Sequence, residues 1–249
     1  MTLLGLLAWP AALPASVVIT PAAGFNITWN GNDGDHFNAA DPAPVPANLA
    51  TGAGASAFTS SDLGPELSLA FHVSSNLNDG RYGNSNSWIG GNFAGAPFAG
   101  ISLGNLHSLS SFAFGRDNGN NVERAQLTDR SLGLYAVQIT RVAAPSSATP
   151  DTGSAATGWQ TIGTLDYTGN VDNTVGGGFT SYFRHQYEIT EGGSGVQATG
   201  FRLLVPSTGR TGGTAIDEIE LYGAAVPEPA AAAMALLSLG GLALRRRRA

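Results

Sequence analysis

Apolar and polar residues alternate with a period of two along several short segments of the chain. In each segment, apolar side chains at every second position face one way and polar side chains face the other. Such alternation predicts strands with one face on a hydrophobic core and the other face in water. The clearest of these segments are 134–141, 183–189, 201–205 and 218–221.

Turn-forming residues separate the alternating segments. Asn78-Asp79-Gly80, the run 117–121 and the three glycines 176–178 are strong turn signals. Short strands joined by turns predict an all-β fold, an antiparallel β-sandwich formed by one domain over 24–223. The segment 143–158 is rich in Ala, Ser, Thr and Pro. Its composition predicts a mobile surface loop between two strands, not a domain boundary.

The N-terminal segment is apolar and uncharged from residue 1 to residue 23. It predicts a secretory signal peptide over 1–23, although no basic residue precedes the apolar run. Cleavage after Ala15 and cleavage after Ala23 both fit, and the sequence does not decide between them. An N-terminal strand or a disordered N-terminus is the alternative.

The C-terminal segment 224–249 has three parts in a fixed order. Pro227-Glu228-Pro229 comes first, an uncharged apolar run over 230–244 follows, and a basic cluster ends the chain. The apolar run predicts a transmembrane helix of about 22 Å, short of the roughly 30 Å hydrocarbon core. Snorkelling arginines can supply the remainder and stay cytoplasmic, so the body lies outside the inner membrane. The cluster consists of Arg245, Arg246, Arg247 and Arg248.

This tail resembles the PEP-CTERM sorting signal of Gram-negative bacteria. The resemblance implies recognition by an exosortase and cleavage near Pro227-Glu228-Pro229. It also implies transient residence in the inner membrane, then delivery to the cell surface or an exopolysaccharide matrix. The alternative is a plain single-span membrane anchor.

The composition excludes several kinds of functional site and argues against one class of partner. The chain of 249 residues has no cysteine, which excludes a disulfide scaffold, a Cys-ligated metal site and a thiol nucleophile. The formal charge of −6 argues against nucleic acid as a main partner.

Motifs within the body come in the order found in one family of β-sandwiches. Asn48-Leu49-Ala50-Thr51-Gly52 comes first, then the loop 76–88 and the segment 98–104 that ends in Leu-Gly. Two apolar segments, 201–205 and 215–223, close the body. This order resembles a discoidin (coagulation factor type C) domain within the galactose-binding-like jelly rolls. The chain lacks the cysteine pair that many animal members have.

The loop 76–88 is the first candidate site. Asp79 lies there among several asparagines and Ser87, and Ca²⁺ takes six to eight oxygen ligands. A turn whose aspartate caps its own backbone is the alternative. The family resemblance implies a structural calcium held by Asp79 and Ser87, with Glu218 closing the shell and Glu220 as the less favoured choice.

A second candidate site would bind carbohydrate, which needs an aromatic platform and planar polar groups. The resemblance implies a ligand at the loop end of the sandwich. Alternatives are that Trp88 is a core aromatic and that Arg116 pairs with Asp117 on the surface. The candidate side chains are Trp88, His107, Arg116, Asn118, Asn121 and Arg124.

Catalytic motifs are missing from the sequence. The four histidines are scattered, and no nucleophile elbow, HExxH or P-loop occurs. Asp217 and Glu218 are adjacent on a predicted strand and so face opposite sides. We therefore expect no enzyme but an exported, non-catalytic domain that binds polysaccharide. A structural or adhesion component of the envelope matrix is the alternative, and a glycoside hydrolase comes third.

Overall fold

The computed structural model describes most of the body of the chain. The predicted helix 230–244 and the sorting-signal residues Glu228, Pro229 and Arg245 to Arg248 lie outside the described residues, as do residues 1–15. The described residues are 16–22, 27–30, 39–40, 48–62, 70–82, 86–90, 97–116, 133–168, 174–175, 179–206 and 214–227.

Strands dominate this part of the chain, so the predicted all-β class is confirmed. Two short 3₁₀ helices, η1 (Leu49–Thr51) and η2 (Ser74–Asn78), are the helical elements among the described residues. None of the described helices is long and apolar enough to cross a membrane. The strands are β1 (Val17–Pro21), β2 (Ile27–Asn30), β3 (Ala39–Ala40), β4 (Ser56–Thr59), β5 (Arg81–Tyr82), β6 (Trp88–Gly90), β7 (Phe98–Arg116), β8 (Leu134–Thr140), β9 (Gln160–Asp166), β10 (Thr174–Val175), β11 (Phe179–Glu191), β12 (Val196–Leu204) and β13 (Thr214–Ala225).

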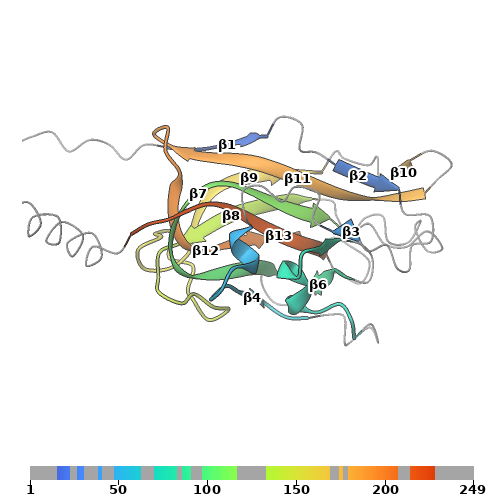
Figure 1. Cartoon of the computed structure of the whole chain (residues 1–249), viewed down its shortest axis with the longest axis horizontal. Coiled ribbons are helices and arrows are strands. Elements are labelled where there is room, and N and C mark those ends of the chain that lie inside the picture. The colour runs from blue at the N-terminus through green and yellow to red at the C-terminus, as the bar shows by residue number, and fades with distance from the viewer. Residues whose placement is uncertain are drawn as a thin grey trace, which may run out of the picture.

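Eleven of these strands join one antiparallel sheet in the part of the chain that the structure describes. Its main order is β1-β11-β7-β12-β8-β9, with β13 and β4 added on β7, β6 on β13, and β2 and β10 on β11. β3 and β5 form a separate pair. In Figure 1, β11 with β1, β2 and β10 runs along the top of the molecule, and β4 and β6 lie at the bottom. The sheet thus wraps around its own core.

The long strand β7 connects the two sides of the sheet. Its first part, from Phe98, pairs with β12 and β4, and its last part, up to Arg116, pairs with β11 and β13. Gly104 lies in the irregular stretch of β7 between Ser102 and His107, with φ +74°, where a Cβ would come within 2.9 Å of the Gly54 carbonyl oxygen. A strand that bends in this way carries one sheet over onto the other face of the core.

The alternation in 134–141 correctly predicts which face of β8 packs on the hydrophobic core. Tyr135, Val137 and Ile139 are buried in the central hydrophobic cluster. The opposite face is not wet, because Gln138 and Thr140 are buried as well. That part of the prediction is wrong, since an amphipathic strand identifies its core face but not whether another segment covers its polar face.

The covering segment is 143–158, which composition alone marked as a mobile loop. Backbone hydrogen bonds fold it onto the sheet, from Arg141 N to Ala155 O (2.7 Å) and from Trp159 N to Pro150 O (2.8 Å). The guanidinium of Arg202 lies over the Trp159 ring, 4.5 Å from its centroid. The segment thus covers the outer face of β8 while most of its own residues are exposed, and its mobility stays a prediction.

The folded part of the chain extends beyond both predicted bounds of the body, residues 24 and 223. β1 lies inside the range 1–23 that was predicted as a signal peptide, and it pairs with β11. β13 extends to Ala225, past the predicted end at 223, and Pro227 follows as an exposed residue. In Figure 1, β1 begins and β13 ends on the same side of the molecule.

Candidate functional site

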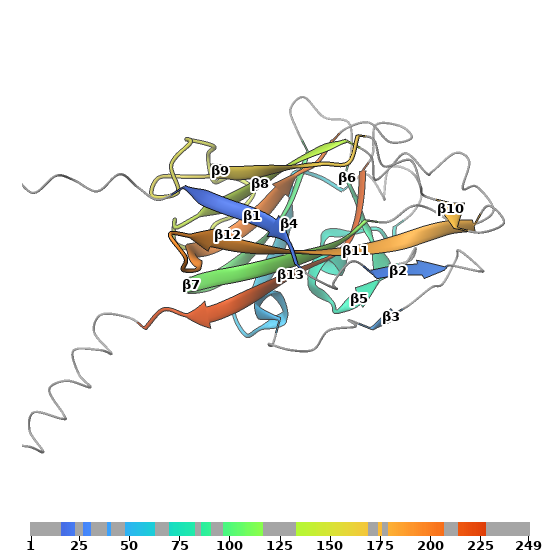
Figure 2. The same cartoon turned by 90° about the horizontal axis from the view of Figure 1, so that it is seen from above.

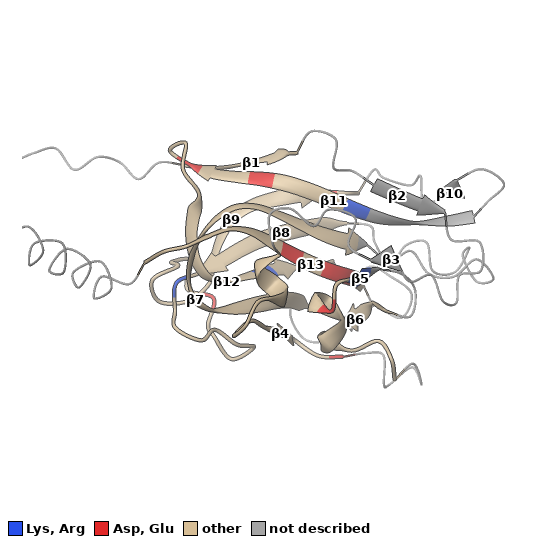
Figure 3. Cartoon of the chain, in the orientation of Figure 1, with Lys and Arg blue, Asp and Glu red and all other residues tan. Residues whose placement is uncertain are grey.

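Asp79 and Glu218 lie together where β13 meets the turn after η2, and Glu220 lies two residues further along β13. Ile219 and Leu221 point from β13 into the core, so Glu218 and Glu220 point to the opposite face of the strand. Both glutamates are fully buried, against the expectation of a wet face. Figure 3 marks these acidic positions along β13.

The turn after η2 brings Asp79 to this face. Gly80 takes φ +78°, which glycine adopts without steric cost and which lets the chain reverse there. The Gly80 N–H donates to Oε2 of Glu218 (3.0 Å), and the Arg81 N–H donates to Oδ1 of Asp79 (2.9 Å). The Gly80 N–H thus ties the turn that carries Asp79 to Glu218 across 138 positions of sequence.

The Asp79 and Glu218 carboxyl groups are close enough to influence each other's charge. Burial raises the pKa of Glu218 well above its usual value, and the charges of Asp79 and Glu220 raise it further. Burial also raises the pKa of Asp79, although Arg81 opposes this through its N–H and its positive charge. Oε1 of Glu218 is buried without a hydrogen-bond partner. Two such carboxylates favour a bound proton or cation between them.

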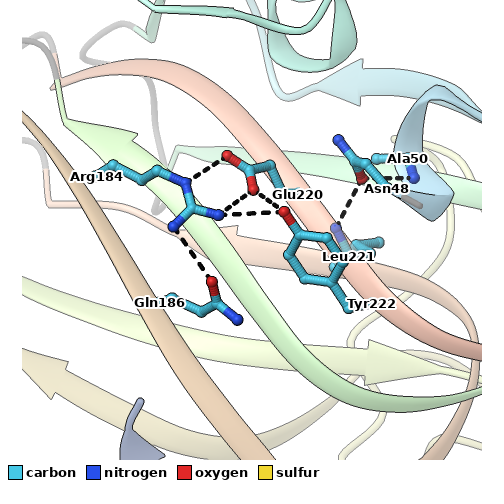
Figure 4. A network of polar contacts seen from close by, with 7 residues as sticks. All are labelled: Asn48, Ala50, Arg184, Gln186, Glu220, Leu221 and Tyr222. Atoms are coloured by element: carbon cyan, nitrogen blue, oxygen red, sulfur yellow. Dashed lines mark hydrogen bonds and ion pairs between the residues drawn. The ribbon is translucent and has the colours of Figure 1, made fainter. Parts of the chain in front are cut away.

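Glu220 has a different environment from Glu218. Nε of Arg184 on β11 donates to Oε1 of Glu220 (2.7 Å), and the second nitrogen of the fork meets the other carboxylate oxygen. Tyr222 bonds the same carboxylate, and Gln186 accepts from Arg184 (3.2 Å). Figure 4 shows this network, with Arg184 facing Glu220 and Tyr222. The charge of Glu220 is therefore already compensated by Arg184 within the protein.

Ser87, the third predicted calcium ligand, lies in a neighbouring buried group. Its hydroxyl is 2.8 Å from Nδ1 of His72, and its carbonyl oxygen accepts from Nδ2 of Asn76 (2.8 Å). No cluster of three His, Cys, Asp or Glu side chains occurs within the described ranges. Beyond the two acids, a cation at Asp79 and Glu218 would need backbone or amide oxygens.

Of the predicted sugar-binding residues, the structure describes the side chains of Trp88 and His107. Trp88 is 0 % exposed, and its indole N–H donates to Ser61 O (3.0 Å) and to Asp62 Oδ1 (2.9 Å). Its ring therefore has no free face for a sugar, and the core-aromatic alternative describes it. His107 and Arg116 are nine residues apart on β7, about 30 Å along a strand. The side chain of Arg116 lies outside the described part, together with Asn118, Asn121 and Arg124.

A small hollow of about 110 Å³ opens at the other end of the sheet. Val17, Ile162 and Val196 line it together with the exposed side chains of Arg141 and Glu191. None of its lining residues is aromatic, so the hollow offers no stacking platform for a sugar.

Sequence reasoning did not identify Arg184 as part of this region. The alternation over 183–189 placed Arg184 on a wet face, whereas it is fully buried against Glu220. No local signal separates a buried arginine from an exposed one. Only the pairing of β7 with both β11 and β13 brings these charges together.

Comparisons with known proteins return similar solved structures only. No family model matches the chain, and no curated protein matches it. A fucolectin from striped bass (Morone saxatilis) shares 14 % identity at a TM-score of 0.46, covering 74 % of this chain and 49 % of the fucolectin chain. Clostridium perfringens CpGH89CBM32-5, in complex with GalNAc-β-1,3-galactose, shares 12 % identity at a TM-score of 0.45, covering 71 % of this chain and 100 % of that one.

A third solved structure is chitosan-binding module 2 of a Paenibacillus sp. IK-5 chitosanase/glucanase, in complex with chitotriose. It shares 21 % identity at a TM-score of 0.40, covering 71 % of this chain and 100 % of the module.

Proposed function

We propose that this chain is an exported, non-catalytic carbohydrate-binding domain, a galactose-binding-like jelly roll with one structural Ca²⁺ held by Asp79 and Glu218. One observation carries the proposal. Glu218 is buried on the closing strand with an unpartnered oxygen, and it meets Asp79 from a distant loop. The family resemblance of the sequence implies these two residues together with Ser87.

The chemistry of the pair suits a hard cation. Calcium prefers carboxylate and carbonyl oxygens, and Asp79 and Glu218 supply two carboxylates from separate segments. A bound Ca²⁺ would supply positive charge that offsets both carboxylates. Asp79 is exposed and Glu218 is buried. A cation that enters from solvent would therefore meet Asp79 first, and Glu218 would be its inner ligand.

The same geometry supports a non-catalytic role. Glycosidases place two carboxyl groups about 5–10 Å apart across an open cleft. Here the two carboxyl groups interact directly, and Glu218 is fully buried. A sugar ring cannot lie between them.

Export and sorting are proposed from the tail sequence. Pro227-Glu228-Pro229, the apolar run and the terminal arginines would direct the chain through the inner membrane to an exosortase. The mature domain would then reach the cell surface or extracellular matrix of a Gram-negative bacterium, where polysaccharide is the ligand.

The test of this function measures Ca²⁺ binding and glycan binding separately. Calorimetry of the full chain measures Ca²⁺ binding, and a glycan array with and without EDTA measures sugar binding. The array includes chitotriose, GalNAc-β-1,3-galactose, fucose and the host exopolysaccharide. We expect saturable glycan binding that EDTA weakens.

Matched variants locate the cation. Asp79→Asn removes the charge of a proposed ligand and should weaken Ca²⁺ binding by at least the roughly 10–100-fold that loss of an outer-shell partner costs. Asp166→Asn is the control, because Asp166 is exposed and, within the described part of the chain, its side chain accepts hydrogen bonds from its own turn at Thr168. Ca²⁺ binding without any glycan binding would favour a structural matrix role. Equal Ca²⁺ affinity in both variants would exclude the proposed cation site.

A further inference from the structure

β1 is an integral strand of the folded sheet. It pairs with β11 from Val17 opposite Glu191 to Pro21 opposite Tyr187. The pairing continues one residue further, because the Ala22 N–H donates to Gln186 O (2.9 Å). This segment therefore satisfies the backbone edge of β11 over the whole length of β1.

β1 also covers the core between the two ends of the sheet. Val17 and Ile19 pack against the hydrophobic cluster, whereas Val18 on the other face is 49 % exposed. Ile19 reaches β9, the last strand of the main order, where its Cδ1 would lie 2.6 Å from a Cβ on Gly163. Figure 2 shows β1 lying between β9 and β11. The absence of a side chain at Gly163 leaves the space that Ile19 fills.

Loss of β1 would expose the edge of β11 and the part of the core that β1 covers. The edge of β11 would be unpaired from Tyr187 to Glu191, and the core residue Ile189 would lose Ile19 beside it. The hollow lined by Val17, Ile162 and Val196 would widen toward the core. An unpaired edge over exposed apolar residues also invites aggregation.

These contacts distinguish the two cleavage positions that the sequence leaves open. Cleavage after Ala23 removes β1 and Ala22, whereas cleavage after Ala15 leaves Ser16 directly ahead of β1. A signal peptidase recognises an A-x-A-like pattern, and both positions supply its alanine directly before the cut. We infer that the exported chain is processed after Ala15, so that the mature domain begins at Ser16 and keeps β1. The inference rests on the proposed export and not on sugar binding.

N-terminal sequencing of the exported protein tests the inference. The full chain is expressed in a Gram-negative host and recovered from outside the inner membrane, and we expect the sequence to begin Ser16-Val17-Val18. Ala15→Arg should abolish processing and leave uncut precursor, while the matched change Ala23→Arg should leave processing intact. A start at Gly24, an uncut wild-type chain, or a block by Ala23→Arg would overturn the inference. Ca²⁺ and glycan binding are measured separately, so failure here is distinct from failure of the proposed function.

A second pair of variants tests the role of β1 itself. Ile19→Asp places a charge against the core and should lower the Tm of the full chain by roughly 5 °C or more. Val18→Asp makes the same change on the exposed face and should leave Tm within about 2 °C. Equal melting of the two variants would show that β1 does not close the sheet.

Discussion

Glu218 and Glu220 are two residues apart on β13 and equally buried, yet their carboxylates have different partners. Glu220 meets a guanidinium and a phenol, so its charge is compensated within the protein. Glu218 meets backbone N–H donors and a second carboxylate, and one of its oxygens has no partner. Burial without a countercharge raises the pKa of Glu218. A bound cation, as proposed above, would supply the missing positive charge.

This difference predicts that the free energy of unfolding of the calcium-free protein depends on pH. The pKa of Glu218 is raised in the folded chain above its ordinary 4.5, so the folded state holds the proton more tightly. The resulting stability is fully present below the unfolded pKa and is lost as pH rises through the raised value. The free energy of unfolding in EDTA should therefore fall for wild type relative to Glu218→Gln as the pH rises above 4.5. A constant difference across this range would contradict the raised pKa.

At the scale of elements, β7 is the strand around which the polar network forms. Arg184 on β11 and Glu220 on β13 face Gly115 and Ala113 of β7 in the register of the sheet. Neighbouring strands lie about 4.8 Å apart, so the two charged side chains must meet across about 9.6 Å. The small residues of β7 leave room for that crossing, which ties β11 to β13.

Breaking one partner of this buried pair should be costly. Arg184→Met leaves the charge of Glu220 uncompensated and should lower the free energy of unfolding by about 3–5 kcal/mol in urea titrations. Combining Arg184→Met with Glu220→Gln removes that charge and should recover much of the loss. A double variant no more stable than the single one would show that the ion pair is not the cause.

At the scale of the whole molecule, contacts between distant segments assemble the candidate site. The Gly80 N–H reaches Glu218, and the side chain of Asn48 accepts from the Leu221 N–H (3.0 Å), so η1 and the η2 turn are both fastened to β13. A cation at Asp79 and Glu218 would strengthen the same connection. Binding there should therefore stabilise the entire domain and not only its loop.

Thermal melting measures this coupling. Ca²⁺ at 100 times its dissociation constant should add about 2.7 kcal/mol, which corresponds to roughly 5–10 °C in Tm for a domain of this size. EDTA should reverse the shift, and Asp79→Asn should show little of it at the same Ca²⁺ concentration. An unchanged wild-type Tm would argue against a cation that couples the loop to β13.

The sequence by itself determined the strand class and the inward face of the strands, because alternation is a property of neighbouring residues. Tyr135, Val137 and Ile139 are buried as that pattern requires, and Asp79-Gly80 forms the predicted turn. The pairing of Asp79 with Glu218 was reached through a family resemblance, not through local pattern.

Only the tertiary structure decided what covers the outward faces. Gln138 lies under 143–158, and Arg184 meets Glu220 across β7, although local pattern assigned both to water. The structure also decided that residues 17–21, which read as part of a leader, close the sheet against β9 and β11. The physical reason is the same in each case: burial of a polar face or an edge depends on segments far away in sequence, and a local pattern carries no information about them.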